Sequence, residues 1–293
     1  MSDEDDRKTK NAIFAAREAA ERASSANSIS KEEVMRRDFG LDIPVSAVPL
    51  PSGGVIYPLD SPLHMQQTVD IRGMTTREED ILMSRALIRK GTVISELIKS
   101  CIVTDGVDVQ SLIGGDRNAL MIAIRILGYG AEYAGSMDCP KCEQKNEISV
   151  DLNGLEVKDL KASPIEAGVN KFSFTLPQTK KEVIFKFLTG KEEEEILATL
   201  EAKKKRGIQN DNIVTTRLLH SIVSVGGIED KTKLAQFISF MPAKDSIALR
   251  QYMDEIEPGI DMKFDFTCKN CEHWEVMPLP LGPSFFWPNA RKS

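Results

Sequence analysis

Several segments of the chain alternate strictly between polar and apolar residues, which is the pattern of a half-buried β-strand. We therefore expect strands at 67–72, 147–152, 172–176, 182–187, 262–266 and 274–277. The segments 172–176 and 182–187 flank a short polar stretch, so we expect them to form a hairpin. Prolines and glycines interrupt residues 41–63, which predicts extended chain with turns and one short edge strand.

Apolar residues that recur at intervals of three and four predict helices between these strands. The expected helices are 76–91, 92–102, 115–130, 190–206, 212–225, 232–240 and 243–256. Thr75 and Glu78 form a capping-box signature that marks the start of the first helix. In 190–206 the glutamates come early and the lysines late, which matches the helix dipole and predicts a solvated face.

Composition narrows the class of protein. Of the 293 residues, 41% are hydrophobic and 28% are charged, as in an ordinary globular protein. The formal net charge of −6 disfavours nucleic acid as the main partner, because a protein that binds nucleic acid needs a basic surface. No apolar run reaches the roughly 18 residues of a membrane helix, and the polar start MSDEDDRKTK is not a secretory signal. We therefore expect a cytosolic chain, outside any membrane, whose thiols stay reduced.

Four of the five cysteines occur as two CxxC pairs, Cys139 with Cys142 and Cys268 with Cys271. A CxxC turn supplies two thiolates with the bite that a tetrahedral Zn²⁺ site needs. A further strand is expected from Glu132 up to the first pair, so each pair lies between two predicted strands and should form the turn of a hairpin. Because 125 residues separate Cys142 from Cys268, the fold must bring the halves together. We predict one structural Zn²⁺ held by all four cysteines.

Other uses of these cysteines are weaker alternatives. A reducing compartment disfavours disulfides, and a redox CxxC belongs at the start of a helix rather than between strands. An iron–sulfur cluster held by the four thiolates remains an alternative. Catalytic zinc needs a free coordination position, which four thiolates do not leave. His273 is an alternative ligand in place of one cysteine, and Cys101 fits a buried structural thiol.

No catalytic motif accompanies the cysteine pairs. The stretch around Gly114 lacks the lysine and the spacing of a P-loop, and the sequence holds no GxSxG or zinc-protease motif. We therefore expect that the chain is not an enzyme and that it has no catalytic residues and no small-molecule substrate. The aromatic run of Phe285, Phe286 and Trp287 has two interpretations, an exposed set of interface anchors or a tail folded back over the core.

Together these patterns predict an α+β fold, with a helical subdomain, antiparallel hairpins and a split zinc-ribbon-like module. We expect residues 1–40 to form a flexible arm, because serines are frequent there and large apolar residues are few. Residues 41–130 form a strand and helical subdomain. The zinc module combines 131–152 with 260–293, and residues 153–259 form an inserted hairpin and helical subdomain.

A succession of short motifs resembles one family of phage proteins. The motifs are Leu50-Pro51-Ser52-Gly53-Gly54-x-x-Tyr57-Pro58, Ile71-Arg72-Gly73-Met74-Thr75-Thr76-x-Glu78-Glu79-Asp80-Ile81-Leu82, Leu112-Ile113-x-Gly115-Asp116-Arg117, Arg125-Ile126-Leu127-Gly128-Tyr129-Gly130-x-x-Tyr133, the two CxxC pairs and Phe285-Phe286-Trp287-Pro288. They cover about residues 45–290. In this order they resemble the baseplate hub proteins of T-even-like contractile-tail phages.

The resemblance implies a structural or assembly component of the tail baseplate hub without enzymatic activity. Its partners would be other phage tail and baseplate proteins. It would be located in the virion or, during assembly, in the host cytoplasm. The alternative is a zinc-ribbon accessory protein that binds nucleic acid. Four lysines and six carboxylates surround the two CxxC pairs, and this mixed, slightly acidic ring weakens that alternative.

Overall fold

The computed structural model describes residues 36–205, 212–279 and 283–286. It divides the chain into two compact units, Met1–Ile43 and Pro44–Ser293. Apart from its last residues, the arm expected at 1–40 lies outside the described residues. In the described part of the first unit, exposed Arg36 and Asp42 form an ion pair of 3.0 Å between Nη2 and Oδ1.

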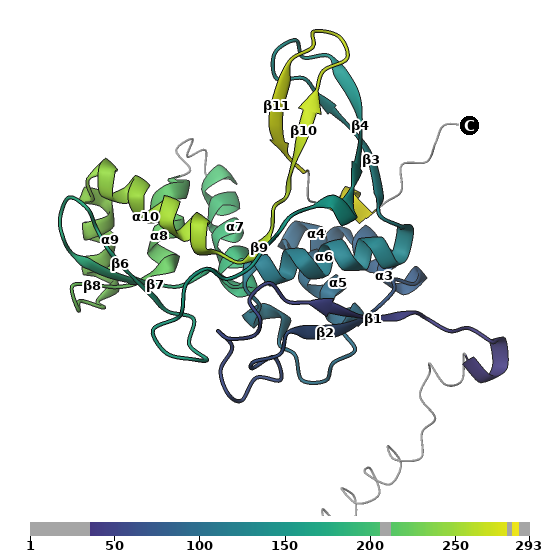
Figure 1. Ribbon diagram of the computed structural model, residues 1–293, viewed down its shortest axis with the longest axis horizontal. Helices are drawn as coiled ribbons and strands as arrows, with labels where there is room; N and C mark the ends of the chain where they lie inside the picture. The colour runs from purple at the N-terminus through teal and green to yellow at the C-terminus, as the bar shows by residue number, and fades with distance from the viewer. Residues whose placement is uncertain (1–35, 206–211, 280–282, 287–293) are drawn as a thin grey trace, which may run out of the picture. The chain divides into compact units, whose positions relative to one another are not determined.

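The first part of the second unit pairs one small sheet with a group of helices around α6 (Figure 1). The sheet joins β1(Val45–Pro49) antiparallel to β2(Thr68–Arg72). The helices are α3(Thr76–Met83), α4(Arg85–Lys90), α5(Val93–Cys101) and α6(Gly114–Tyr129), with the 3₁₀ turn η1(Val109–Ser111) before α6. Helix α6 contacts α5 and both strands, so it forms the centre of this core.

The single helix expected over 76–91 is wrong, because the chain forms two helices there. Ser84 ends α3 and begins α4 with an extended backbone, at φ −66° and ψ 102°. Its hydroxyl oxygen accepts a hydrogen bond of 3.5 Å from the Leu87 N–H. A serine hydroxyl that caps a new helix competes with the backbone bonds of a continuous one, which is why the break falls at this residue.

Glu78, whose side chain is fully buried, ties β2 to α3 and α5. Arg72 on β2 donates to both carboxylate oxygens, at 2.7 and 3.1 Å, and the Ser100 hydroxyl on α5 donates at 2.5 Å. Thr75 donates from its backbone and its hydroxyl, which confirms the predicted capping box. Burial raises the pKa of Glu78, but these donors outweigh it and lower the pKa from 4.5 to about 2.

A second buried carboxylate joins two of the sequence motifs. Asp116 in the first turn of α6 accepts hydrogen bonds from the Ser52 N–H at 3.0 Å and the Ser52 hydroxyl at 2.6 Å. The Tyr57 hydroxyl donates to the same carboxylate at 2.5 Å. Burial raises the pKa of Asp116, and the hydrogen bonds act in the opposite direction. These bonds hold the turns between β1 and β2 on the start of α6.

The start of α6 also lies against the short strand β9(Gly259–Ile260), which pairs with β5(Val157–Lys158). A Cβ atom on Gly115 would lie 1.8 Å from the carbonyl oxygen of Pro258. No real Cβ contact is that short, so only glycine permits this backbone approach. The two backbones therefore touch where the inserted segment returns to the core.

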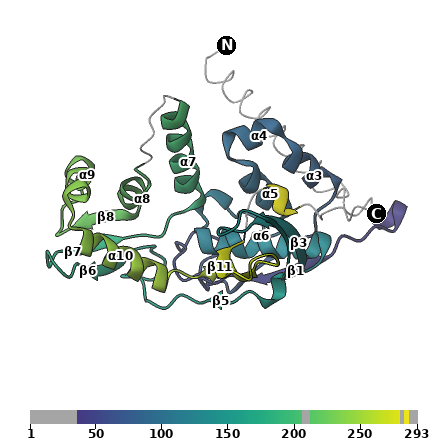
Figure 2. The same cartoon turned by 90° about the horizontal axis from the view of Figure 1, so that it is seen from above.

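Residues 152–256 form a further sheet and further helices, beginning with the 3₁₀ turn η2(Leu152–Gly154). The strands β6(Phe172–Thr175), β7(Glu182–Phe185) and β8(Ile222–Val225) are antiparallel neighbours. The helices are α7(Gly190–Lys205), α8(Ile213–Ser221), α9(Lys231–Phe240) and α10(Ala243–Ile256). Figure 2 shows α7, α8 and α9 next to one another. Tyr252 on α10 stacks on Phe174 of β6 at 4.7 Å between ring centroids.

The helix expected over 212–225 is wrong in its last turn. Helix α8 ends at Ser221, and the following residues form β8. Ile222, Val223 and Val225 are β-branched, and such residues pack well on a pleated strand. Pairing with β7 therefore outweighs the helical spacing at these positions.

The aromatic residues near the C-terminus pack into the core. Phe285 and Phe286 in the 3₁₀ turn η3(Pro283–Phe286) have no exposed surface. The Phe285 ring lies 5.2 Å from that of Tyr133. Buried Arg125 on α6 donates to the Phe285 carbonyl at 3.2 Å. The interpretation as exposed interface anchors is therefore wrong for these two residues, while Trp287 lies outside the described residues.

The architecture confirms the predicted α+β class, with small antiparallel sheets and a cluster of four cysteines. The hairpin predicted at 172–187 is confirmed as β6 and β7. Among the described residues, no helix has the length and apolar character needed to cross a membrane.

Replacing Glu78 by Gln should remove the buried charge that Arg72 contacts. Breaking one side of a buried ion pair costs about 3–5 kcal/mol, so we expect urea unfolding near neutral pH to show a loss of that order. The pKa of Glu78 is lowered from 4.5 to about 2, so its stabilising effect is lost as pH falls through this window. The gap to wild type should therefore close there. Exposed Asp80→Asn on the same helix is the control, and a gap independent of pH would contradict the prediction.

Gly115→Ala should force the backbones of α6 and β9 apart, since the new methyl group would overlap the Pro258 carbonyl. We expect a loss of about 3 kcal/mol in the free energy of unfolding, measured by urea denaturation. Gly114→Ala is the matched control, because the nearest atom to its Cβ is 3.9 Å away. Its stability should change by less than about 1 kcal/mol. Equal effects of the two substitutions would refute the close approach.

Candidate metal centre

Two β-hairpins carry the two CxxC pairs. The strands β3(Glu132–Asp138) and β4(Lys145–Asp151) form the first, and β10(Lys263–Thr267) and β11(Trp274–Pro278) form the second. The hairpins stand side by side with their turns at the same end (Figure 1). Both hairpins carry buried apolar residues that belong to the hydrophobic core: Tyr133, Ile148 and Val150 on the first and Phe266 on the second. Burial of these side chains stabilises each hairpin in the fold.

The two cysteine turns have the same backbone hydrogen bonds. The N–H of the first cysteine donates across the turn at 2.9 Å in both, from Cys139 to Gln144 and from Cys268 to His273. The first cysteine's carbonyl accepts from the residue after the second cysteine, at 2.9 Å in one turn and 3.0 Å in the other. The sequence similarity of the two CxxC turns thus reflects a repeated local structure.

The residue after each CxxC adopts a left-handed backbone. Glu143 has φ 57° and Glu272 has φ 55°. This conformation is uncommon outside glycine, and it costs of order 1 kcal/mol or more for a residue with a side chain. Both hairpins adopt this conformation at the equivalent position, directly after the second cysteine, where the chain turns toward the returning strand.

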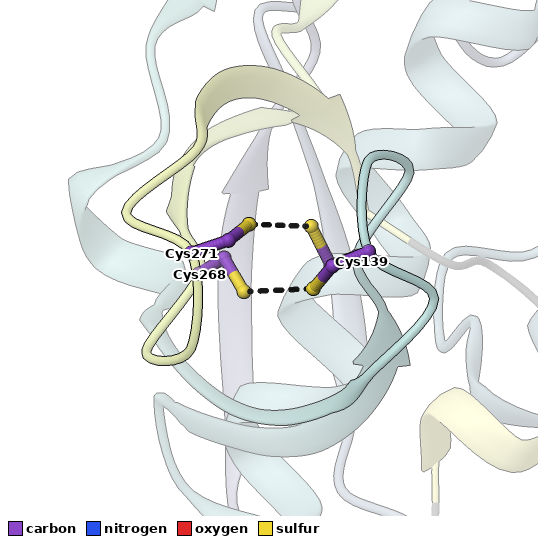
Figure 3. Close-up of side chains that lie close together, drawn as sticks. Cys139, Cys268 and Cys271 are labelled. Atoms are coloured by element: carbon purple, nitrogen blue, oxygen red, sulfur yellow. Dashed lines mark hydrogen bonds between the residues drawn. The ribbon is translucent and has the colours of Figure 1, made fainter.

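The four sulfur atoms meet between the turns. All lie within 4.8 Å of one another, and Figure 3 shows the two turns facing each other with their sulfurs in the gap. The closest pairs join the hairpins, with Cys139 Sγ 3.7 Å from Cys271 Sγ and Cys142 Sγ 3.6 Å from Cys268 Sγ. Cys139 and Cys268 are buried, while Cys142 and Cys271 are partly exposed.

These distances fit a tetrahedral zinc site. With Zn–S bonds of about 2.3 Å, neighbouring sulfurs of a tetrahedron lie about 3.8 Å apart, close to the 3.6 and 3.7 Å found here. A disulfide needs about 2.05 Å, so the cysteines are free thiols. Among the described residues, no other group of His, Cys, Asp or Glu has the spacing of a metal site.

Backbone N–H groups surround the buried sulfurs. The Lys141 N–H donates to Cys139 Sγ and the Asn270 N–H donates to Cys268 Sγ, each at 3.4 Å. Burial raises the pKa of Cys268, but N–H donors from Cys271, Asn270 and Asn146 outweigh it and lower the pKa from 9.0 to about 6. The site therefore favours a thiolate at this position, which is the form that binds a metal.

Sequence reasoning missed Asn146, which contacts both turns. Its side chain is 3% exposed, and its amide nitrogen lies 3.5 Å from Cys268 Sγ. The inward side of β4 carries Asn146, Ile148 and Val150. A polar residue on that otherwise apolar side was the signal that could have found it, since buried polar groups require partners.

The other candidate residues lie outside the sulfur cluster. The His273 ring contacts Glu275 at 3.2 Å between Nε2 and Oε2, and its carbonyl belongs to the second cysteine turn. Cys101 on α5 is fully buried, and burial followed by the nearby Glu78 carboxylate raises its pKa to about 12. This confirms Cys101 as a buried thiol away from the site.

Comparison with known proteins identifies the family. A family model described as "T4 bacteriophage base plate protein" matches residues 50–287, a span that includes both cysteine turns. No curated protein and no solved structure gives a significant match. Since the match covers most of the sequence, the chain belongs to the T4 bacteriophage base plate protein family.

Proposed function

We propose that the chain is a structural or assembly component of the tail baseplate hub, held together by one structural Zn²⁺ and without catalysis. The observation that carries the proposal is the cluster of four sulfurs, with distances across the two hairpins of 3.6 and 3.7 Å. Cys139, Cys142, Cys268 and Cys271 would supply all four ligands.

The ligand set supports a structural role for the metal. Four thiolates complete the tetrahedron, so no position stays open for water or substrate. A bound ion would cross-link two hairpins that are 125 residues apart in sequence. Because metal binding is coupled to folding, it would stabilise the native fold in a cytosol where disulfides are reduced.

Family membership and the sequence motifs support the place in the phage. Membership in the base plate family points to other phage tail proteins as partners. The hub in particular rests on the resemblance of the motifs between residues 45 and 290. We accordingly place the chain in the virion, at the tail baseplate, or in the host cytoplasm during assembly.

The surface of the metal module gives the nucleic-acid alternative no support. Its charged side chains near the turns are exposed and mixed in sign. They comprise four lysines and six carboxylates: Lys141, Lys145, Lys263, Lys269, Asp138, Glu143, Glu147, Asp265, Glu272 and Glu275. A net acidic ring repels phosphates rather than releasing their counterions.

We also propose a division of the chain into three parts. We assign 41–130 to the first subdomain, 131–152 with 260–293 to the metal module, and 153–259 to the insertion. The separate sheet of β6, β7 and β8 in the insertion supports this division.

Elemental analysis of purified protein should find one zinc per chain. Cys142→Ser should lose most of this zinc, because a hydroxyl is a poor replacement for a thiolate, and its melting temperature should fall. Cys101→Ser is the matched control, since Cys101 lies outside the cluster, and it should keep its zinc even if it is less stable. A zinc-free wild type with four titratable thiols in the cluster would contradict the proposal.

Cross-linking mass spectrometry of purified phage tails tests the place in the baseplate. Amine-reactive cross-links from exposed lysines such as Lys263 and Lys269 should lead to central baseplate proteins, in mature tails or in assembly intermediates. Cross-links found only to tail-tube, sheath or capsid proteins would contradict the hub assignment and leave the metal site unaffected.

A further inference from the structure

We propose that Asn146 is a positioning residue of the metal centre, which fixes the second cysteine turn against the first and slows the release of zinc. This inference rests on the proposed zinc site. It assigns to a residue that is not a ligand a measurable effect on how long the metal stays bound.

The side chain of Asn146 reaches from one hairpin into the other. It extends from β4 of the first hairpin and donates from Nδ2 to Cys268 Sγ of the second, at 3.5 Å. Its Oδ1 accepts a hydrogen bond of 2.8 Å from the backbone N–H of Lys269. The second Nδ2 hydrogen goes to the Gln144 carbonyl at 2.8 Å. One buried amide thus contacts the backbone of both cysteine turns and one sulfur.

Comparison of the two hairpins separates the role of Asn146 from that of the turns. Because the turns repeat each other, Glu275 of β11 holds the position equivalent to Asn146. Glu275 is exposed and contacts the His273 ring at 3.2 Å. A buried side chain that contacts a sulfur is therefore not required at this position by the hairpin itself. The first hairpin buries an amide there, and that amide contacts the sulfur of the opposite hairpin.

The charge of the site explains why this contact matters. Four thiolates and one Zn²⁺ carry a net charge of −2, and burying it is costly unless donors face the sulfurs. Cys268 is one of the two buried cysteines of the cluster, and it accepts from both Asn270 N and Asn146 Nδ2. Residues that hold metal ligands in this way typically change metal affinity 10- to 100-fold when replaced.

Asn146→Asp is the sharpest test because it preserves the shape of the side chain. An aspartate oxygen can still accept from the Lys269 N–H, but the other oxygen would face the Cys268 thiolate as a negative charge. Asn146→Ser removes the reach to Cys268 without adding a charge. Glu275→Gln is the matched control, at the equivalent position of the other hairpin.

The first readout is the rate at which zinc passes from the folded full-length protein to the chromophoric chelator pyridylazoresorcinol. We expect release about 10- to 100-fold faster from Asn146→Asp, a smaller increase for Asn146→Ser, and a wild-type rate for Glu275→Gln. Wild-type release from both Asn146 variants would overturn the inference.

The second readout is the absorption spectrum of the cobalt-substituted protein, which a general loss of stability would not shift. Losing an N–H donor raises the electron density on the Cys268 sulfur, so both Asn146 variants should shift the sulfur-to-cobalt charge-transfer band to lower energy. The band should stay in place in Glu275→Gln. An unshifted band in both Asn146 variants would overturn the inference, whereas a wild type that binds neither zinc nor cobalt would overturn the proposed function itself.

Discussion

The meeting of two hairpins, one from the middle of the chain and one from near its end, is the contact on which the four-cysteine cluster depends. Either hairpin alone is two strands, and an isolated two-stranded hairpin is at best marginally stable in water. In the folded protein Tyr133, Ile148 and Phe266 of these hairpins are buried, and the four thiols lie within 4.8 Å of one another. The sulfur cluster therefore exists only when both hairpins are in place.

Helix α6 connects this module to the rest of the unit through polar contacts that are buried. Asp116 at its start holds the turns between β1 and β2, and Gly115 touches the strand where the insertion returns. Near its other end Arg125 donates to the carbonyls of Gly130, Glu132 and Phe285. Buried polar groups of this kind are costly when a partner is lost. They favour one arrangement of the surrounding segments over similar ones with the same apolar contacts.

The sequence predicted the elements whose signals are local. The capping box at Thr75 and Glu78, the hairpin of β6 and β7, and the two CxxC turns all depend on residues a few positions apart. The errors occurred where tertiary contacts outweighed a local pattern. Pairing with β7 turned the end of an expected helix into β8. The sequence left open whether Phe285 is exposed or folded over the core, and its contact with distant Tyr133 shows that it is buried.

The candidate site shows the same limit. The four cysteines were identifiable because ligand type and spacing are visible in the sequence. Asn146 was not identified, since its importance depends on Cys268 and Lys269, more than a hundred positions away. A polar residue on an apolar strand face indicates that a partner exists, but the sequence of one chain does not say which residue it is.

The order of the cysteines along the chain has a consequence for synthesis on the ribosome. Cys139 and Cys142 emerge long before Cys268 and Cys271, with the whole insertion translated in between. During that interval the first pair has no partner, and a nascent chain that stalls anywhere between them carries half a site. The sulfur cluster can therefore close only after Cys271 has been translated. It forms only on chains that already contain all the residues between the two cysteine pairs.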